Sequence, residues 1–148
     1  MSYFNSAFVN TNGISIHYYR SLASNRLTTL GDPIVMLHGV TDNGLCWERV
    51  ALALHDRYDI IMMDARGHGK TDSPEDGYGI EDRAADVAGL IDGLGIKKAV
   101  LLGHSMGAET ATATAAAYPA NIRALILEDP PWPGRFWGST PEEREERA

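Results

Sequence analysis

The stretch Ala99-Val100-Leu101-Leu102-Gly103-His104-Ser105-Met106-Gly107 decides the fold of this 148-residue chain. Its four leading apolar residues predict a buried strand, and the alanine-rich residues 108–118 that follow predict a helix stopped by Pro119. A serine between two glycines is a weak signal alone, but the order strand, sharp turn, helix gives it weight. Ser105 is therefore expected to project at the carboxyl end of a parallel strand, where open α/β sheets bind ligands.

Outward from this stretch, strand and helix patterns alternate along the chain, which is typical of a parallel sheet with helices on both faces. Two extended segments near the amino terminus meet at Asn12-Gly13, a pair that favours a tight hairpin turn. Apolar patterns place further strands at 34–37, 58–63, 97–102 and 122–127, and helices at 45–55, 80–94 and 105–118. The sequence predicts an α/β fold with a mostly parallel, twisted sheet of six strands that opens with an antiparallel hairpin.

The composition excludes several classes of protein. A formal net charge of −7, with no basic stripe to neutralise phosphates, argues against a nucleic-acid partner. No apolar run approaches the ~18 residues of a membrane span, and the first residues do not resemble a signal peptide. The single cysteine, Cys46, has no internal disulfide partner, which fits a reducing compartment. We expect a cytoplasmic protein with no membrane contact, no cofactor and no metal.

Three motifs follow one another along the chain: His38-Gly39 after the third expected strand, Asp64-Ala65-Arg66-Gly67-His68-Gly69 after the fourth, and the Ser105 turn after the fifth. With these motifs the chain resembles the α/β-hydrolase family, in its branch of serine esterases, lactonases and haloperoxidases. The resemblance implies an incomplete α/β-hydrolase fold that lacks the last strands and most of the cap. Residues 1–131 are then the amino-terminal part of the core, and residues 132–148 the start of the cap.

The resemblance also implies roles for individual residues. Ser105 corresponds to the nucleophile, and the backbone N–H groups of Met106 and Val40 correspond to the two donors of the oxyanion hole. Gly39 lets the backbone pass close to the substrate. His38 is expected to line the substrate site while shaping its loop. Arg66 and His68 belong to a motif that we interpret as a scaffold.

The histidine required to activate a serine nucleophile is not identifiable. All five histidines precede Ser105, whereas the family's chain order is nucleophile, acid, histidine. We therefore expect the catalytic histidine from a carboxyl-terminal segment that this chain lacks, either of the same gene or of a second chain. Asp129 is a candidate for the acid, and a pocket-lining or turn residue is the alternative. Trp132 is expected to contact substrate at the entrance to the cap.

The resemblance favours a hydrolase that acts on an ester, lactone or related acyl substrate of small size through an acyl-enzyme at Ser105. A carbon–carbon bond hydrolase, a cofactor-free haloperoxidase and a non-catalytic ligand-binding protein remain as alternatives. Epoxide hydrolase and dehalogenase chemistry is disfavoured, because those relatives carry aspartate where this chain has Ser105. The 148-residue chain alone is expected to be inactive.

Overall fold

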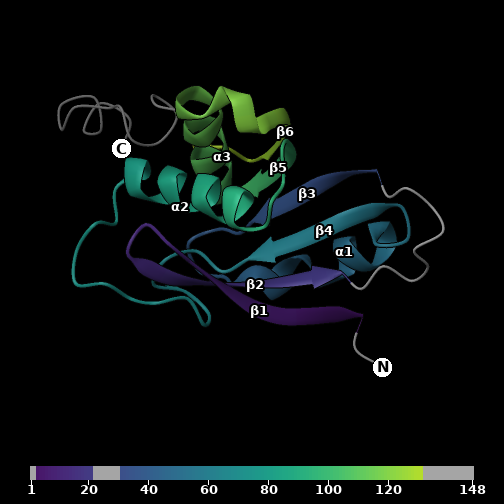
Figure 1. Cartoon of the computed structure of the whole chain (residues 1–148), viewed down its shortest axis with the longest axis horizontal. Helices are drawn as coiled ribbons and strands as arrows, with labels where there is room; N and C mark the ends of the chain where they lie inside the picture. The colour runs from purple at the N-terminus through teal and green to yellow at the C-terminus, as the bar shows by residue number, and fades with distance from the viewer. Residues whose placement is uncertain (1–2, 22–30, 132–148) are drawn as a thin grey trace, which may run out of the picture.

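The computed structural model describes residues 3–21 and 31–131 (Figure 1). The expected cap segment 132–148, including Trp132, lies outside these residues. In chain order the elements are β1 (Phe4–Thr11), β2 (Ile14–Ser21), β3 (Gly31–Leu37), the 3₁₀ turn η1 (Gly44–Trp47), α1 (Glu48–Leu54), β4 (Tyr58–Met63), α2 (Ile80–Gly93), β5 (Ala99–His104), α3 (Met106–Ala117), the 3₁₀ turn η2 (Pro119–Asn121) and β6 (Ile122–Glu128).

The six strands form one sheet in the order β1-β2-β4-β3-β5-β6. β1 and β2 pair antiparallel, and β2 pairs antiparallel with β4. β4, β3, β5 and β6 run parallel to one another. The predicted α/β fold, with its mostly parallel sheet and opening hairpin, is confirmed.

The hairpin turn has the backbone geometry that its sequence favours. Asn12 and Gly13 have φ angles of 50° and 76°, the left-handed region in which asparagine and glycine are best tolerated. Two successive residues of positive φ give the turn a twist that matches the twist of the flanking strands. The turn sets the register in which Thr11 pairs with Ile14 and Phe4 with Ser21.

Helices cover both faces of the sheet. α2 and α3 lie side by side on one face, and α1 lies on the other (Figure 1). Alternate residues of β3 serve the two faces, since Val35 and Leu37 belong to the apolar cluster that includes α2 and α3 residues. Ile34 and Met36 belong to the cluster on the α1 side. A strand buried on both faces needs a continuous apolar run, and this explains why the sequence pattern identified β3.

The helix expected at 45–55 divides into two parts. Residues Gly44–Trp47 form the 3₁₀ turn η1, and α1 begins only at Glu48. The Asn43 side chain accepts a hydrogen bond from the Leu45 N–H at 3.0 Å, and the Gly44 N–H is bound by the Asp64 carboxylate at 2.7 Å. These contacts satisfy N–H groups at the start of the turn, whose tighter 3₁₀ form is common at helix ends.

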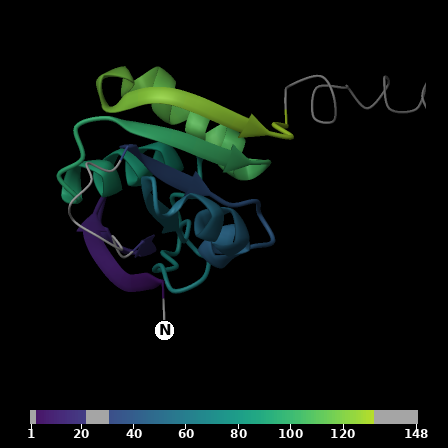
Figure 2. The same ribbon diagram turned by 90° about the vertical axis from the view of Figure 1, so that its right-hand side faces the viewer.

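The carboxyl ends of the parallel strands meet at one edge of the sheet. The segments that follow them therefore lie close together: 38–44 after β3, 64–71 after β4, Ser105 after β5 and Asp129 after β6. Figure 2 shows β5 and β6 as neighbours. Within the described part of the chain β6 pairs only with β5.

Candidate active site

Ser105 stands at a sharp turn between β5 and α3. Its φ and ψ are 50° and −114°, a conformation that side-chain-bearing residues rarely adopt. The Ser105 N–H donates to the Glu128 carbonyl at 3.0 Å, and the Ser105 carbonyl accepts from Ala108 and Glu109 at 2.9 and 3.1 Å. The strained residue is thus tied to β6 on one side and to α3 on the other, and its side chain is only half-buried.

The two glycines around Ser105 are required by close backbone contacts. A Cβ atom at Gly103 would lie 2.3 Å from the Gly107 carbonyl oxygen. A Cβ atom at Gly107 would lie 2.2 Å from the Leu37 carbonyl oxygen on β3. Since both neighbours are backbone atoms, neither can move aside cheaply. The turn therefore requires glycine at both positions, as the G-x-S-x-G pattern predicts.

The loop after β3 passes directly beside the serine. A Cβ atom at Gly39 would lie 2.9 Å from His104 Nδ1, so a larger residue would have to displace the His104 ring, and 3.7 Å from Ser105 Cβ, an ordinary contact. Val40 follows in this loop, and its side chain is 62% exposed. Met106 is the first residue of α3, where the N–H has no partner within the helix. The structure brings the Val40 loop and the start of α3 together around Ser105.

His38 is buried and has both ring nitrogens engaged. Nδ1 lies 2.7 Å from the Gly39 carbonyl oxygen, and Nε2 lies 3.0 Å from the Ala65 backbone nitrogen. Because a carbonyl accepts and an N–H donates, the proton resides on Nδ1 and the ring is neutral. Burial lowers the pKa of His38, which agrees with this state. His38 therefore joins the loop after β3 to the loop after β4.

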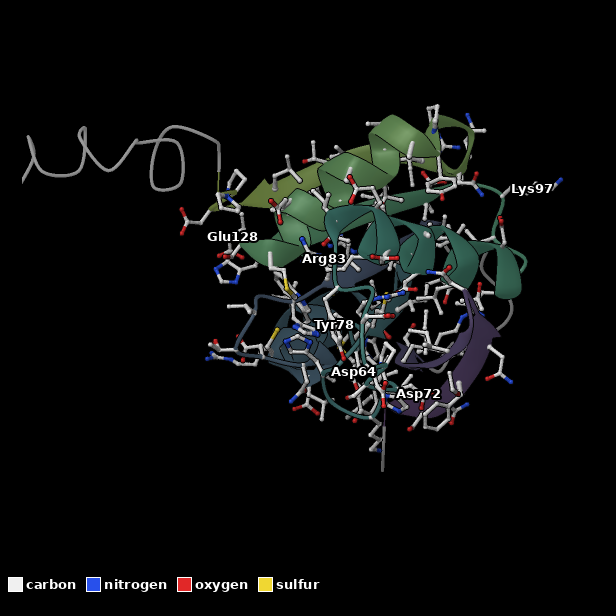
Figure 3. The ribbon with its side chains drawn as sticks, turned by 90° about the vertical axis from the view of Figure 1, so that its left-hand side faces the viewer. Asp64, Asp72, Tyr78, Arg83, Lys97 and Glu128 are labelled. Atoms are coloured by element: carbon white, nitrogen blue, oxygen red, sulfur yellow. The ribbon has the colours of Figure 1, made fainter. Side chains whose placement is uncertain are left out.

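Asp64 provides a second link between the same loops. Its buried carboxylate accepts hydrogen bonds from the Gly44 N–H at 2.7 Å and the Lys70 N–H at 3.0 Å. His68, four residues along, places Nε2 2.8 Å from the Val40 carbonyl oxygen. Figure 3 shows Asp64 beside the opening hairpin, with Glu128 at the end of β6 in another part of the molecule. The loop after β4 thus supports the loop that carries Gly39 and Val40.

Arg66 forms a buried ion pair that the sequence pattern did not predict. The Arg66 guanidinium donates to Asp86 through Nε at 2.6 Å and through Nη2 at 2.7 Å, and both side chains are buried. The hydrogen bonds to Asp86 raise the pKa of Arg66. The signal available in the sequence was an acidic residue inside the apolar run Ala84–Ile91 of α2.

A cleft lies next to this ion pair and reaches the start of α3. It is narrow: its cavity volume is about 10 Å³, close to the space needed for one water molecule. Its lining comes from both strand-end loops and both helices, including His38, Arg66, Arg83, Met106 and Thr110.

Asp129 lies at the carboxyl end of β6, with φ of 43° and an exposed side chain. Its neighbour Glu128 accepts the Ser105 N–H, so this strand end stands beside the serine. Within residues 3–21 and 31–131, no histidine is hydrogen-bonded to Asp129 or to Ser105. The role of Asp129 as the acid stays a prediction.

All five histidines fall in the described part of the chain, and none is placed as the base. His17 contacts Ser6 and Asp64 in the hairpin region. His55 lies 3.7 Å from Asp56, after α1. His104 ends β5 and lies against Gly39.

Among the described residues no group of three or more histidine, cysteine, aspartate or glutamate side chains is arranged to hold a metal ion. The helices described here are all too short or too polar to cross a bilayer.

A sequence profile of the family described as alpha/beta hydrolase fold matches residues 32–145. The 2-(acetamidomethylene)succinate hydrolase of Mesorhizobium japonicum is 41% identical over 99 residues, which are 67% of this chain and 36% of that protein. The N-formylmaleamate deformylase of Pseudomonas putida is 36% identical over 130 residues, which are 86% of this chain and 46% of that protein. The chain thus spans less than half the length of these two relatives.

Solved structures show the same fold. The wild-type protein Cfl2 from Burkholderia cenocepacia has a TM-score of 0.80 and 31% identity, and the match covers 90% of this chain and 44% of that one. The epoxide hydrolase CorEH has a TM-score of 0.77 and 28% identity, with 86% of this chain and 42% of that one covered. Together with the profile match and the order of strands around Ser105, these similarities show that the chain belongs to the α/β-hydrolase fold family.

Proposed function

We propose that the protein hydrolyses an ester, lactone or related acyl substrate of small size through an acyl-enzyme at Ser105. The observation that carries this proposal is the strained backbone of Ser105, held by bonds to Glu128 and to α3. Strain of this kind costs about 1–3 kcal/mol and persists where the surrounding structure enforces it, commonly at active sites. A turn with no chemical task is expected to carry glycine at such a position, because glycine adopts positive φ without strain.

In this mechanism Ser105 Oγ attacks the acyl carbon as its proton passes to a general base. Negative charge then develops on the carbonyl oxygen, which the Met106 and Val40 N–H groups would stabilise. Each such donor contributes about 2.7–4 kcal/mol to the transition state in measured cases. The protonated base then donates its proton to the leaving group. Water, activated by the same base, attacks the acyl-enzyme and releases the acyl group from Ser105.

The base is proposed to come from outside residues 1–148. His38 has both ring nitrogens bonded to backbone groups, and His17 is directed to Ser6 and Asp64. Asp129, at the end of the strand next to β5, is the candidate acid that would orient this base. Activity is accordingly expected of a longer protein rather than of this chain alone.

One relative and the identity of residue 105 favour acyl chemistry over epoxide opening. The deformylase is named for removing a formyl group, which is the smallest acyl group. The epoxide hydrolases of this family use aspartate as the nucleophile, whereas this chain has Ser105. Serine forms an ester intermediate with a carbonyl substrate, as acyl transfer requires.

Labelling with a fluorophosphonate tests the proposal. The full-length protein is expected to be phosphonylated at Ser105 and to hydrolyse p-nitrophenyl esters, and a Ser105→Ala variant should lose both properties at this position. A matched Ser73→Ala variant, which changes an exposed loop serine, should behave as the parent protein. A folded, complete protein that never labels at Ser105 would refute the enzyme and favour a ligand-binding role.

A further inference from the structure

A second serine, far from Ser105, also contacts a histidine and an aspartate in series. Ser6 Oγ lies 2.6 Å from His17 Nε2, and His17 Nδ1 lies 2.8 Å from Asp64 Oδ2. Ser6 comes from β1, His17 from β2 and Asp64 from the end of β4. The three residues belong to the opening hairpin and its neighbour, and none of them contacts Ser105.

The hydrogen-bond partners determine where the protons lie. The Asp64 carboxylate already accepts two backbone N–H groups, from Gly44 and Lys70, and therefore acts as an acceptor toward His17 as well. In the neutral ring the proton then lies on His17 Nδ1, which leaves the lone pair of Nε2 facing Ser6. The Ser6 hydroxyl consequently donates to Nε2. Nucleophile, base and orienting carboxylate stand in the same relation as in serine hydrolases.

The base is buried, whereas Ser6 as a residue is exposed. The His17 ring is completely buried, and it packs edge-to-face against Phe8 at 4.9 Å and Tyr19 at 4.6 Å between ring centroids. Ser6 is exposed, and so is Phe8 with 54% of its surface accessible. The Lys70 ammonium group lies 5.4 Å from the Tyr19 ring centroid. A reagent with an aromatic group and an electrophilic carbonyl can therefore reach the hydroxyl beside apolar rings.

We propose that Ser6 is a second acyl-acceptor site, which takes the acyl group of an activated aryl ester. The Ser6 proton passes to His17 Nε2 as Oγ bonds to the carbonyl carbon. The bond between this carbon and the aryl oxygen breaks, and the aryl oxide leaves with the proton from His17. The products are O-acyl-Ser6 and a phenol, so atoms and charge balance.

The same geometry predicts that Ser6 is modified once and does not turn over rapidly. Ser6 lies within β1, where successive N–H groups point to opposite edges of the strand and cannot converge on one oxygen. Ser105, in contrast, precedes a helix whose first N–H groups are available. Loss of a single oxyanion donor slows acyl transfer by about 10²–10³-fold in measured cases. The ester at Ser6 is therefore expected to persist.

The experiment uses the full-length protein with Ser105→Ala, so that the site of the proposed function cannot contribute. The protein is treated with p-nitrophenyl acetate, and acetylated serines are mapped by mass spectrometry over time. Ser6 is expected to acetylate about 100-fold faster than Ser73, an exposed loop serine, because general-base assistance commonly gives 10²–10⁴-fold. Equal rates at Ser6 and Ser73 would overturn the proposal.

A second variant distinguishes base catalysis by His17 from the simple solvent exposure of Ser6. His17→Gln retains a hydrogen-bonding group toward Ser6 but cannot accept its proton, so acetylation of Ser6 should fall to the rate of Ser73. Circular dichroism establishes that this variant is folded. If it is not, the comparison of Ser6 with Ser73 in the parent protein decides alone. Fast acetylation of Ser6 in folded His17→Gln protein would contradict the role of His17. Because the protein carries Ser105→Ala throughout, neither outcome depends on the proposed function.

Discussion

Replacing Ser105 by glycine is expected to stabilise the protein, although it deletes the proposed nucleophile. Ser105 has φ of 50° and ψ of −114°, and its backbone is held there by the bonds to Glu128, Ala108 and Glu109. Glycine adopts positive φ without the clash of a Cβ atom. Ser105→Ala keeps the Cβ atom and hence the strain, so the alanine variant is the matched reference.

The magnitude follows from two opposing contributions. Relief of the strained conformation is worth about 1–3 kcal/mol. The extra freedom of glycine in the unfolded chain offsets about 0.5–1 kcal/mol of this gain. Ser105→Gly is therefore expected to exceed Ser105→Ala by about 1 kcal/mol in the free energy of unfolding. For a protein of this size or somewhat larger, this corresponds to a rise in Tm of about 3 °C.

Urea unfolding followed by circular dichroism measures the difference, with m-values compared to ensure that the same transition is observed. Ala113→Gly, in the middle of α3, is the control, because glycine there has no strain to relieve and should destabilise by about 1 kcal/mol. A Ser105→Gly protein that is no more stable than Ser105→Ala would refute the strained turn, and with it the main support for a serine nucleophile.

Two further predictions concern groups that support the site. Asp86→Asn removes the charge that pairs with buried Arg66 and should cost about 3–5 kcal/mol in urea unfolding. The double change Arg66→Met/Asp86→Leu should cost less, and a larger loss in the double variant would contradict this. Burial lowers the pKa of His38, so the unfolded chain takes up a proton near pH 6.5 before the folded protein does. Stability present above about pH 6.5 is then lost as the pH falls through the lowered pKa. His38→Gln should flatten the pH dependence of the free energy of unfolding, and an unchanged slope in this variant would argue against the contribution of His38.

Local patterns were sufficient to predict the order of the elements and the position of the serine turn. The Asn12-Gly13 hairpin could be predicted because both residues tolerate positive φ, and the structure has both in that region. The strand–turn–helix around Ser105 could be predicted because a short apolar run, two glycines and an alanine-rich segment adjoin one another. Each of these signals depends on residues that are neighbours in the chain.

The local pattern was less informative where distant groups competed for the backbone. The expected helix at 45–55 begins with a 3₁₀ turn, and the Asp64 carboxylate, 20 residues away, binds the Gly44 N–H at the start of this turn. The roles assigned to Val40, Met106 and Asp129 by family resemblance remain predictions, although the structure places all three around the carboxyl ends of the strands.

The sequence by itself determined the fold class and singled out Ser105, because periodicity and glycine spacing are local properties. Only the tertiary structure paired Arg66 with Asp86, joined His38 to Ala65, and aligned Ser6 with His17 and Asp64. The directly bonded partners in these groups are 11 to 47 residues apart, and hydrogen bonds depend on distance and direction in space. Only the folded sheet, which sets its strands about 4.8 Å apart, brings such residues within bonding range.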